Sequence, residues 1–240
     1  MSLLIVFSKY MKNGYHMSKI LIVTAHPDDL EYFAGGFLLK AVKHNHEVSS
    51  IIITNGELSP KNNSKEVNRN TRRNETKLSL QEKVKNIFFL DLKDGSIAYG
   101  ITKNKLKELN YIFEKIVHPD FVLTHNPNDY HSDHREIASL IEKIVSFKVP
   151  IFYMDTFAGS NKKPDFILDI TEEFTEKCDL LRKHISQSHL FLDQRAEIIN
   201  SFRGLQYLNS INKYGEAFYY DSSLHTKSIE NLFYNLNRGN

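Results

Sequence analysis

One histidine and three carboxylates follow an apolar run near the start of the chain. The segment 24–36 reads TAHPDDLEYFAGG and places His26, Asp28, Asp29 and Glu31 within six residues, directly after the apolar residues 20–23. Neighbouring carboxylates repel each other and are costly to remove from water. The pattern therefore predicts either that a cation lies among these groups or that the loop is exposed to solvent.

A second group of the same kind follows the apolar run 121–124. It reads HSDH and places His131 and His134 three positions apart, at the start of an expected helix. A zinc site for hydrolysis uses three protein ligands and leaves one position for water. His26, Asp29 and one of the later histidines would supply such a set, and a cation there would lower the pKa of a bound water to about 7. A second carboxylate beside the cation, Asp28, would then accept the proton of that water.

Each motif on its own has a simpler interpretation. AHPDD is compatible with an Asp-rich turn that caps a helix, with Asp29 accepting backbone N–H groups. Two histidines three positions apart often lie on solvated helix ends. Both segments, however, follow strands of the same expected sheet, and this convergence favours a metal site.

The elements that must position these residues alternate between strand-like apolar runs and helix-like segments. This alternation predicts an α/β fold with an open, mostly parallel sheet flanked by helices. Ligands of such sheets bind beyond the carboxyl ends of the strands. We expect strands at 19–24, 47–54, 86–92, 121–124, 149–154 and 165–170, helices at 30–44, 71–83, 103–117, 133–147 and 171–186 (capped by Thr171), a polar loop at 61–70, and a final edge strand or packed coil at 218–220.

The composition indicates one globular domain. The chain has 240 residues, of which 41% are hydrophobic and 25% charged, enough to bury a core without disulfides. We expect residues 17–240 to form a single domain and residues 1–16, which precede Met17, to be an extension that is disordered or not native. The single cysteine, Cys178, excludes a disulfide framework and fits a reducing, cytoplasmic compartment.

Several classes of function find no support in the sequence. The net charge of +2 gives no electrostatic footprint for nucleic acid. No apolar stretch is long enough for a membrane span, and residues 2–7 lack the flanks of a signal peptide. No glycine-rich phosphate-binding motif follows the first strand, and Ser59 and Cys178 lack a context for covalent catalysis. Apolar residues in the last fifty positions would serve either the core or a homo-oligomer interface.

Taken together, the motifs resemble the LmbE-like or PIG-L family of zinc-dependent N-deacetylases. The resemblance rests on AHPDDLE at 25–31, TNGE at 54–57, RRNE at 72–75 and THNPNDYHSDH at 124–134, with DIT at 169–171, Lys177, HISQ at 184–187 and GEAF at 215–218 in support. It implies a Rossmann-like fold and the removal of the acetyl group from an N-acetylglucosamine-type sugar or sugar conjugate by a metal-activated water.

The resemblance also implies roles for individual residues. The ligands of Zn²⁺, or of another divalent metal such as Fe²⁺ or Co²⁺, would be His26, Asp29 and His134. Asp28 would be the general base. His131 would be the acid or the stabiliser of the tetrahedral intermediate, with Asp133 holding its ring.

The resemblance also suggests residues that would bind the substrate. Arg72, with Arg73 as its rival, would contact a hydroxyl or phosphate group, and Glu57 and Asp94 lie where sugar hydroxyls would be held. The simpler interpretations are a helix pair between Arg72 and Glu75 and ordinary turn chemistry at 55–56.

The identity of the substrate is not readable from the sequence. The segments 59–70 and 155–163 are expected to frame the mouth of the site, and Lys162, Lys163 and the two arginines suggest an anionic group. Two alternatives stay open: a non-catalytic sugar-binding module of the same fold, and a zinc hydrolase of another amide or of an ester.

Overall fold

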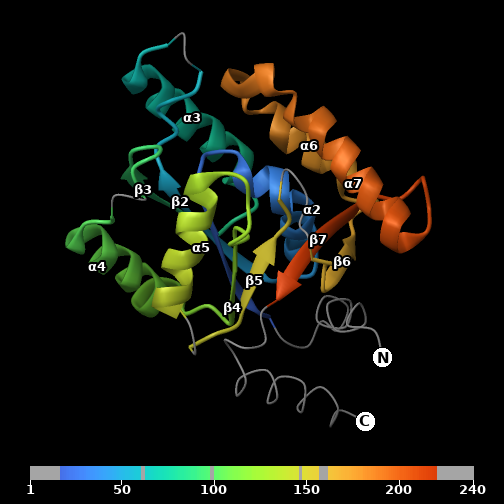
Figure 1. Ribbon diagram of the computed structural model, residues 1–240, viewed down its shortest axis with the longest axis horizontal. Coiled ribbons are helices and arrows are strands. Elements are labelled where there is room, and N and C mark those ends of the chain that lie inside the picture. Colours follow the sequence, from blue (N-terminus) through green and yellow to red (C-terminus); the bar gives the residue numbers. More distant parts are fainter. Residues whose placement is uncertain (1–16, 61–62, 98–99, 146–147, 157–161, 221–240) are drawn as a thin grey trace.

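The chain folds into a mixed sheet with helices on both faces (Figure 1). The structure is a computed structural model and describes residues 17–60, 63–97, 100–145, 148–156 and 162–220. The sheet in this part of the chain has the order β3-β2-β1-β4-β5-β7-β6. Its strands are β1 (Lys19–Thr24), β2 (Glu47–Thr54), β3 (Asn86–Leu92), β4 (Phe121–Thr124), β5 (Ile151–Met154), β6 (Phe166–Asp169) and β7 (Gly215–Tyr220).

The sheet is mostly parallel, which confirms the predicted fold class. Strands β1 to β5 run parallel to one another, and β7 runs antiparallel to both β5 and β6. The strand order reverses between β1 and β4, which pair directly. A crevice forms beyond the strand ends at such a switch point. The two histidine-bearing segments follow β1 and β4, so the topology alone brings them together.

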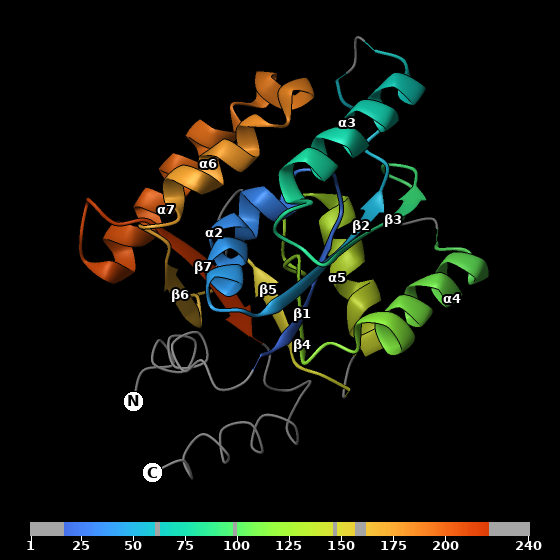
Figure 2. The same cartoon turned by 180° about the vertical axis from the view of Figure 1, so that it is seen from behind.

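Helices cover the two faces separately (Figure 2). One face carries α2 (Asp29–Lys43), α3 (Lys65–Leu80), α6 (Phe174–Arg182) and α7 (Leu192–Leu208), and the other carries α4 (Lys103–Tyr111), the π-helix Ile112–Val117 and α5 (Ser132–Val145).

The residues of β1 alternate between the two cores. Ile20 and Ile22 pack into the cluster under α2, whereas Leu21 and Val23 pack into the cluster under α5. This alternation explains the continuous apolar run, since a strand covered on both faces has no exposed side.

Helix α2, which begins at the candidate metal ligand Asp29, is kinked at Ala34 (φ −140°, ψ 22°). The N–H groups of Gly36 and Phe37, just past the kink, donate to the two carboxylate oxygens of Glu216 at 2.8 and 2.7 Å. Lys177, fully buried, donates to the same carboxylate at 2.8 Å. The GEAF motif and Lys177 therefore hold the kinked helix in place.

Removing the buried charge of Lys177 should destabilise the fold. We expect Lys177→Met to lower the free energy of unfolding by about 3–5 kcal/mol, because Glu216 would stay buried without its cation. Urea unfolding would measure the change. The matched control is Lys85→Met, which breaks the exposed pair with Glu47 (2.7 Å) and should cost less than about 1 kcal/mol. Equal losses in the two variants would contradict the structural role given to Lys177.

Two helix starts differ from the sequence-based expectation. Helix α3 begins at Lys65 rather than at residue 71, because the side chain of Ser64 accepts the N–H of Val67 and caps the helix there. Much of the expected polar loop is therefore helical. Helix α6 begins at Phe174 rather than at Thr171. The hydroxyl of Thr171 instead donates to Asp169 at 2.6 Å, within the turn that follows β6, so the predicted cap is wrong.

The C-terminal part also differs. The expected helix 171–186 ends at Arg182, and a 3₁₀ helix, Ile185–Leu190, follows it. Strand β7 lies between β5 and β6, so residues 218–220 belong to an internal strand and not to an edge. Residues 1–16 lie outside the described part, and their nature stays a prediction. Among the described helices, none combines the length and the apolar composition needed to cross a membrane.

Candidate active site

Asp29 stands at the centre of a cluster of imidazoles. Its Oδ2 accepts the backbone N–H of His26 at 2.7 Å and lies 3.2 Å from Nδ1 of the same residue. Nε2 of His134 lies 3.4 Å from this oxygen. Asp29 and His134 are buried. The structure thus brings together the three residues that the sequence predicted as metal ligands.

A fourth imidazole, His125, belongs to the same cluster. It follows β4 directly, so its place at this edge of the sheet was expected, but the sequence indicated no role for it. Donor atoms lie within 4.8 Å of one another in two groups, of which one is His26, His131 and His134 and the other is Asp29, His125 and His134. Nε2 of His125 accepts the N–H of Ala25 at 2.9 Å, so its lone pair is already in use. Burial, and then the neighbouring His134, lower the pKa of His125 to about 4. His125 therefore links the ends of β1 and β4, and the structure gives it no free lone pair at Nε2 for a metal.

Asp129 orients His134, a role that the sequence analysis did not assign. Its Oδ2 lies 3.2 Å from Nδ1 of His134, which leaves Nε2 directed at Asp29. Its Oδ1 accepts the N–H of His131 at 2.8 Å. Carboxylates commonly hold metal-binding histidines in this way, through the ring nitrogen that does not face the metal.

The carboxylates of the cluster favour a positive charge among the imidazoles. Burial by itself would lower the pKa of His26, but Asp29 and Asp133 outweigh burial and raise it to about 10. Burial likewise opposes ionisation of Asp29, yet the surrounding imidazoles hold its pKa well below the ordinary value. A set of imidazole nitrogens around a buried carboxylate oxygen is the donor chemistry that Zn²⁺ prefers, and Fe²⁺ or Co²⁺ also accept it. His26, Asp29 and His134 therefore fit a divalent metal.

Asp28 lies next to the cluster in a strained backbone conformation (φ 128°, ψ −22°). It occupies the N-cap position of α2, but its side chain makes no capping hydrogen bond. Burial raises the pKa of its carboxyl group above the ordinary value, and the guanidinium of Arg72 opposes this rise. The carboxylate is buried, has a raised pKa and makes no hydrogen bond to the helix start. Such a group is suited to accept a proton.

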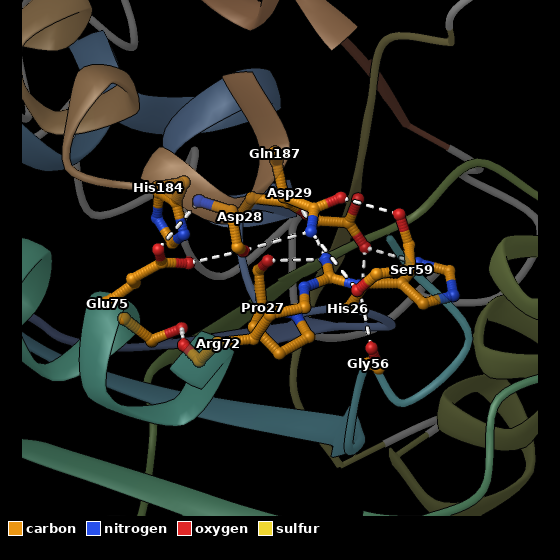
Figure 3. A network of polar contacts seen from close by, with 12 residues as sticks. His26, Pro27, Asp28, Asp29, Gly56, Ser59, Arg72, Glu75, His184 and Gln187 are labelled. Carbon is orange, nitrogen blue, oxygen red and sulfur yellow. Dashed lines mark hydrogen bonds and ion pairs between the residues drawn. The ribbon is translucent and has the colours of Figure 1, made fainter. Parts of the chain in front are cut away.

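Arg72, and not Arg73, faces the site. Arg72 is buried and donates to Oδ2 of Asp28 at 2.9 Å, to the carbonyl of Pro27 at 2.7 Å and to the carbonyl of Gly56 at 3.2 Å (Figure 3). A Cβ atom on Gly56 would lie 2.8 Å from Nη1 of Arg72, and Gly56 has φ +68°. The glycine is therefore needed for this close approach as well as for the turn.

Arg73 points to the outer surface. It pairs with the exposed Asp91 at 2.9 Å, and its guanidinium lies 4.3 Å from the ring centre of Phe89. Glu75 accepts from the N–H and the hydroxyl of Ser186, at 2.8 and 2.6 Å. The simple helix pair between Arg72 and Glu75 is therefore not what the structure contains.

The carboxylate of Asp133, expected to hold the ring of His131, instead contacts His26. Its Oδ2 lies 3.3 Å from Nε2 of His26 and accepts the N–H of Gly95 at 2.8 Å. It is the backbone N–H of Asp133 that reaches His131, donating to Nδ1 at 3.3 Å. The helix start, and not the carboxylate, thus orients the His131 ring.

Glu57 and Asp94, the two other residues expected to contact the substrate, are hydrogen-bonded to other groups of the protein. The buried carboxylate of Glu57 accepts from Arg69 at 2.9 Å and from Asn55 at 3.2 Å, and Glu57 does not line the cavity at the site. Asp94 does line it, but its two oxygens accept the N–H groups of Gly56 and Leu58 at 2.9 and 3.0 Å. Both residues shape the loop after β2, and the structure offers Glu57 no contact with a ligand in the cavity.

The cavity beside the cluster has a volume of about 410 Å³. Its rim includes Ser59 and Gln187, whose side chains are hydrogen-bonded at 2.9 Å (Figure 3). Ser59 falls in the segment expected at the mouth. Residues 157–161 of the other expected segment lie outside the described part, and Lys162 and Lys163 are not among the residues that line the cavity.

Comparison with known proteins adds three likenesses. Residues 21–145, just over half of the chain, match the model of the family described as "PIG-L: GlcNAc-PI de-N-acetylase". A probable N-acetyl-alpha-D-glucosaminyl L-malate deacetylase 2 of Bacillus cereus is 25% identical over 207 residues, which cover 75% of this chain and 89% of the relative. The N,N'-diacetylchitobiose deacetylase of Pyrococcus horikoshii superposes with a TM-score of 0.70 at 25% identity, covering 90% of this chain and 89% of the other.

The fold is also found in a protein with a different reaction. The 4-carboxy-2-hydroxymuconate hydratase GalB of Pseudomonas putida KT2440 superposes with a TM-score of 0.73 at 21% identity, covering 85% of this chain and 95% of the other. This likeness concerns the fold alone, because one fold often carries several chemistries.

Proposed function

This chain belongs to the PIG-L family, and on that premise we infer that it is a hydrolase that removes the acetyl group from an N-acetylated amino sugar. One observation carries the assignment of the site. Segments after β1 and β4 bring imidazole and carboxylate donors within 4.8 Å of one another, beside the buried carboxylate of Asp28. That arrangement suits hydrolysis of an amide with the help of a metal.

The proposed ligands of the metal are His26, Asp29 and His134, with Zn²⁺ as the first choice. When bound, the cation would supply Lewis-acid polarisation and lower the pKa of a water molecule at the site. The chain's own residues would then do the proton transfers. Asp28 would accept the proton of the attacking water while Arg72 holds its carboxylate at 2.9 Å. The same proton would then pass from Asp28 to the nitrogen of the departing amine as the C–N bond breaks, which leaves acetate and the free amino sugar.

His131 is proposed to stabilise the charge that develops on the acetamide oxygen. Burial, and then the nearby His26, lower the pKa of His131, so the ring is neutral near pH 7. Because Nδ1 accepts the N–H of Asp133, the proton of the neutral ring resides on Nε2. The ring can therefore donate a hydrogen bond from Nε2 without first being protonated, and donors of this kind typically contribute several kcal/mol to catalysis.

The direct test is acetate release from N-acetylglucosamine and its glycosides. We expect turnover by the purified protein, its loss after treatment with a chelator, and its recovery when Zn²⁺ is added back. The donor cluster predicts this result because a proton acceptor alone does not polarise an amide. Turnover that survives complete removal of metal would refute the proposed metal centre.

The same assay addresses the two alternatives. A sugar-binding module would bind N-acetylglucosamine in calorimetry without releasing acetate at any metal loading. A hydrolase of another bond would release no acetate from the sugars but would cleave aryl esters or other amides in the presence of Zn²⁺.

A further inference from the structure

We propose that the sugar of the natural substrate carries an uncharged, apolar aglycone, such as an alkyl or aryl group, and not an anionic one. This inference rests on the proposed function and concerns the part of the cavity beyond the metal centre. It departs from the expectation drawn from Lys162, Lys163 and the paired arginines, which favoured an anionic group.

The first support is that the described lining of the cavity contains no lysine or arginine that is available to a substrate. Arg72 is the one lysine or arginine among these residues, and it is only 4% exposed. Its two terminal nitrogens are already bonded to Asp28, Pro27 and Gly56. A carboxylate or phosphate on the aglycone would have to break these bonds to reach it.

The second support is the excess of negative charge around the cavity. Its described lining includes the carboxylates of Asp28, Asp29, Asp94 and Asp133. The charge of a divalent cation at the proposed site is offset by Asp29 and Asp133, both of which contact His26. An anionic aglycone would therefore meet like charge in a partly desolvated space, which is costly.

The third support is an apolar wall formed by Leu58, Leu190 and Leu192, together with the ring of Tyr32. Leu58 is 48% exposed, although it lies beside a cavity. The side-chain bond between Ser59 and Gln187 joins its segment to the 3₁₀ helix that carries Leu190. An apolar aglycone placed against Leu58 and the half-buried Leu190 would remove these two side chains from water, which is favourable, whereas Leu192 and Tyr32 are already buried.

This wall is built rigidly, because three parts of the HISQ motif are fixed to three different elements. His184 lies 2.9 Å from Glu31 of α2, and Ser186 donates to Glu75 of α3. Gln187 bonds to Ser59 in the loop after β2 (Figure 3). The 3₁₀ helix is thereby held in one position, and Leu190 is presented to the cavity without a rearrangement.

The test compares two glycosides that differ in the aglycone. Phenyl N-acetyl-α-D-glucosaminide and N-acetyl-α-D-glucosaminyl L-malate share the sugar and the anomer, and free N-acetylglucosamine serves as the reference. With Zn²⁺ present, we expect kcat/KM for the phenyl glycoside to exceed that for the malate glycoside by about tenfold or more, the order of discrimination that a few buried carbon atoms give.

Two variants at Leu58 separate the effects of shape and charge. Leu58→Gln should lower kcat/KM for the phenyl glycoside, mainly through KM, and leave the malate glycoside poor. Leu58→Lys should do the same and raise kcat/KM for the malate glycoside by about tenfold, because it supplies the missing cation. Ile198→Lys, which adds the same charge at a 72% exposed position of α7 outside the cavity lining, should not change the ratio.

The outcomes distinguish this inference from the proposed function. A malate glycoside that is cleaved as well as, or better than, the phenyl glycoside would overturn the inference and leave the deacetylase intact. No acetate from any of the three sugars, with Zn²⁺ bound, would overturn the proposed function itself.

Discussion

Replacing Asp28 with asparagine is expected to reduce acetate release by about 10²–10⁴-fold, the usual contribution of a general base. The introduced amide keeps the shape of the side chain and still accepts a hydrogen bond from Arg72, but it cannot take the proton of water. His26, Asp29 and His134 are unchanged, so the variant should bind as much metal as the parent protein. Initial rates and elemental analysis of the same preparation would test both expectations.

The structure offers a matched control for this substitution. Asp91 also pairs with an arginine, Arg73, at 2.9 Å, but both side chains are about two-fifths exposed and lie away from the cavity. Asp91→Asn should therefore keep full activity. Near-normal turnover in Asp28→Asn, with its metal content intact, would show that Asp28 is not the base.

The fold was readable from the sequence because its strands are covered on both faces. A run such as 20–23 has no polar position, and its alternation with helical segments leaves few arrangements other than a parallel sheet. Most described strand and helix ends agree with the expectation within about two residues, the usual spread of such boundaries. The errors at Lys65 and Phe174 arose where a single hydroxyl, on Ser64 or Thr171, decided where a helix begins.

The convergence of the site was also predictable, but the pairing within it was not. Because β1 and β4 are parallel neighbours, the residues that follow them lie at the same edge of the sheet. His26, Asp29 and His134 are therefore close together. The hydrogen-bond partner of each side chain depends on differences of a few ångströms in the relative positions of the loops, which the sequence does not indicate.

Two contacts illustrate this limit. Arg72 reaches Asp28, 44 positions away in the sequence, only because α3 packs over the loop after β1 and Gly56 leaves room for the guanidinium. The carboxylate of Asp133 turns to His26 because the N–H of Gly95 holds it there. Neither contact leaves a periodic signal in the sequence. The sequence does place Asp129 at the same edge of the sheet, five positions before His134 on the loop that leads into the same helix, but it does not indicate which histidine Asp129 contacts.

The second prediction with a large effect concerns the proposed metal centre. His134 belongs to both groups of donor atoms, so His134→Ala should remove a proposed ligand that the two groups share. His125, whose ring stacks on that of His134, keeps its Nε2 bonded to the N–H of Ala25. We expect the metal content to fall from about one equivalent per chain to a trace, and acetate release to fall to background, because a catalytic zinc site needs its three protein ligands.

A graded set of variants makes the result specific to metal binding. Asp129→Asn should keep the ligand but loosen its orientation, and weaken metal affinity by about 10–100-fold, as is typical for groups that orient a ligand. His189→Ala, at an exposed histidine outside the cavity lining, should change neither quantity. Thermal melting of each variant without metal separates the loss of the ligand from a loss of folding. If a folded His134→Ala protein still binds one equivalent of Zn²⁺, the metal binds outside this cluster. That result would also contradict the proposed roles of Asp28 and His131.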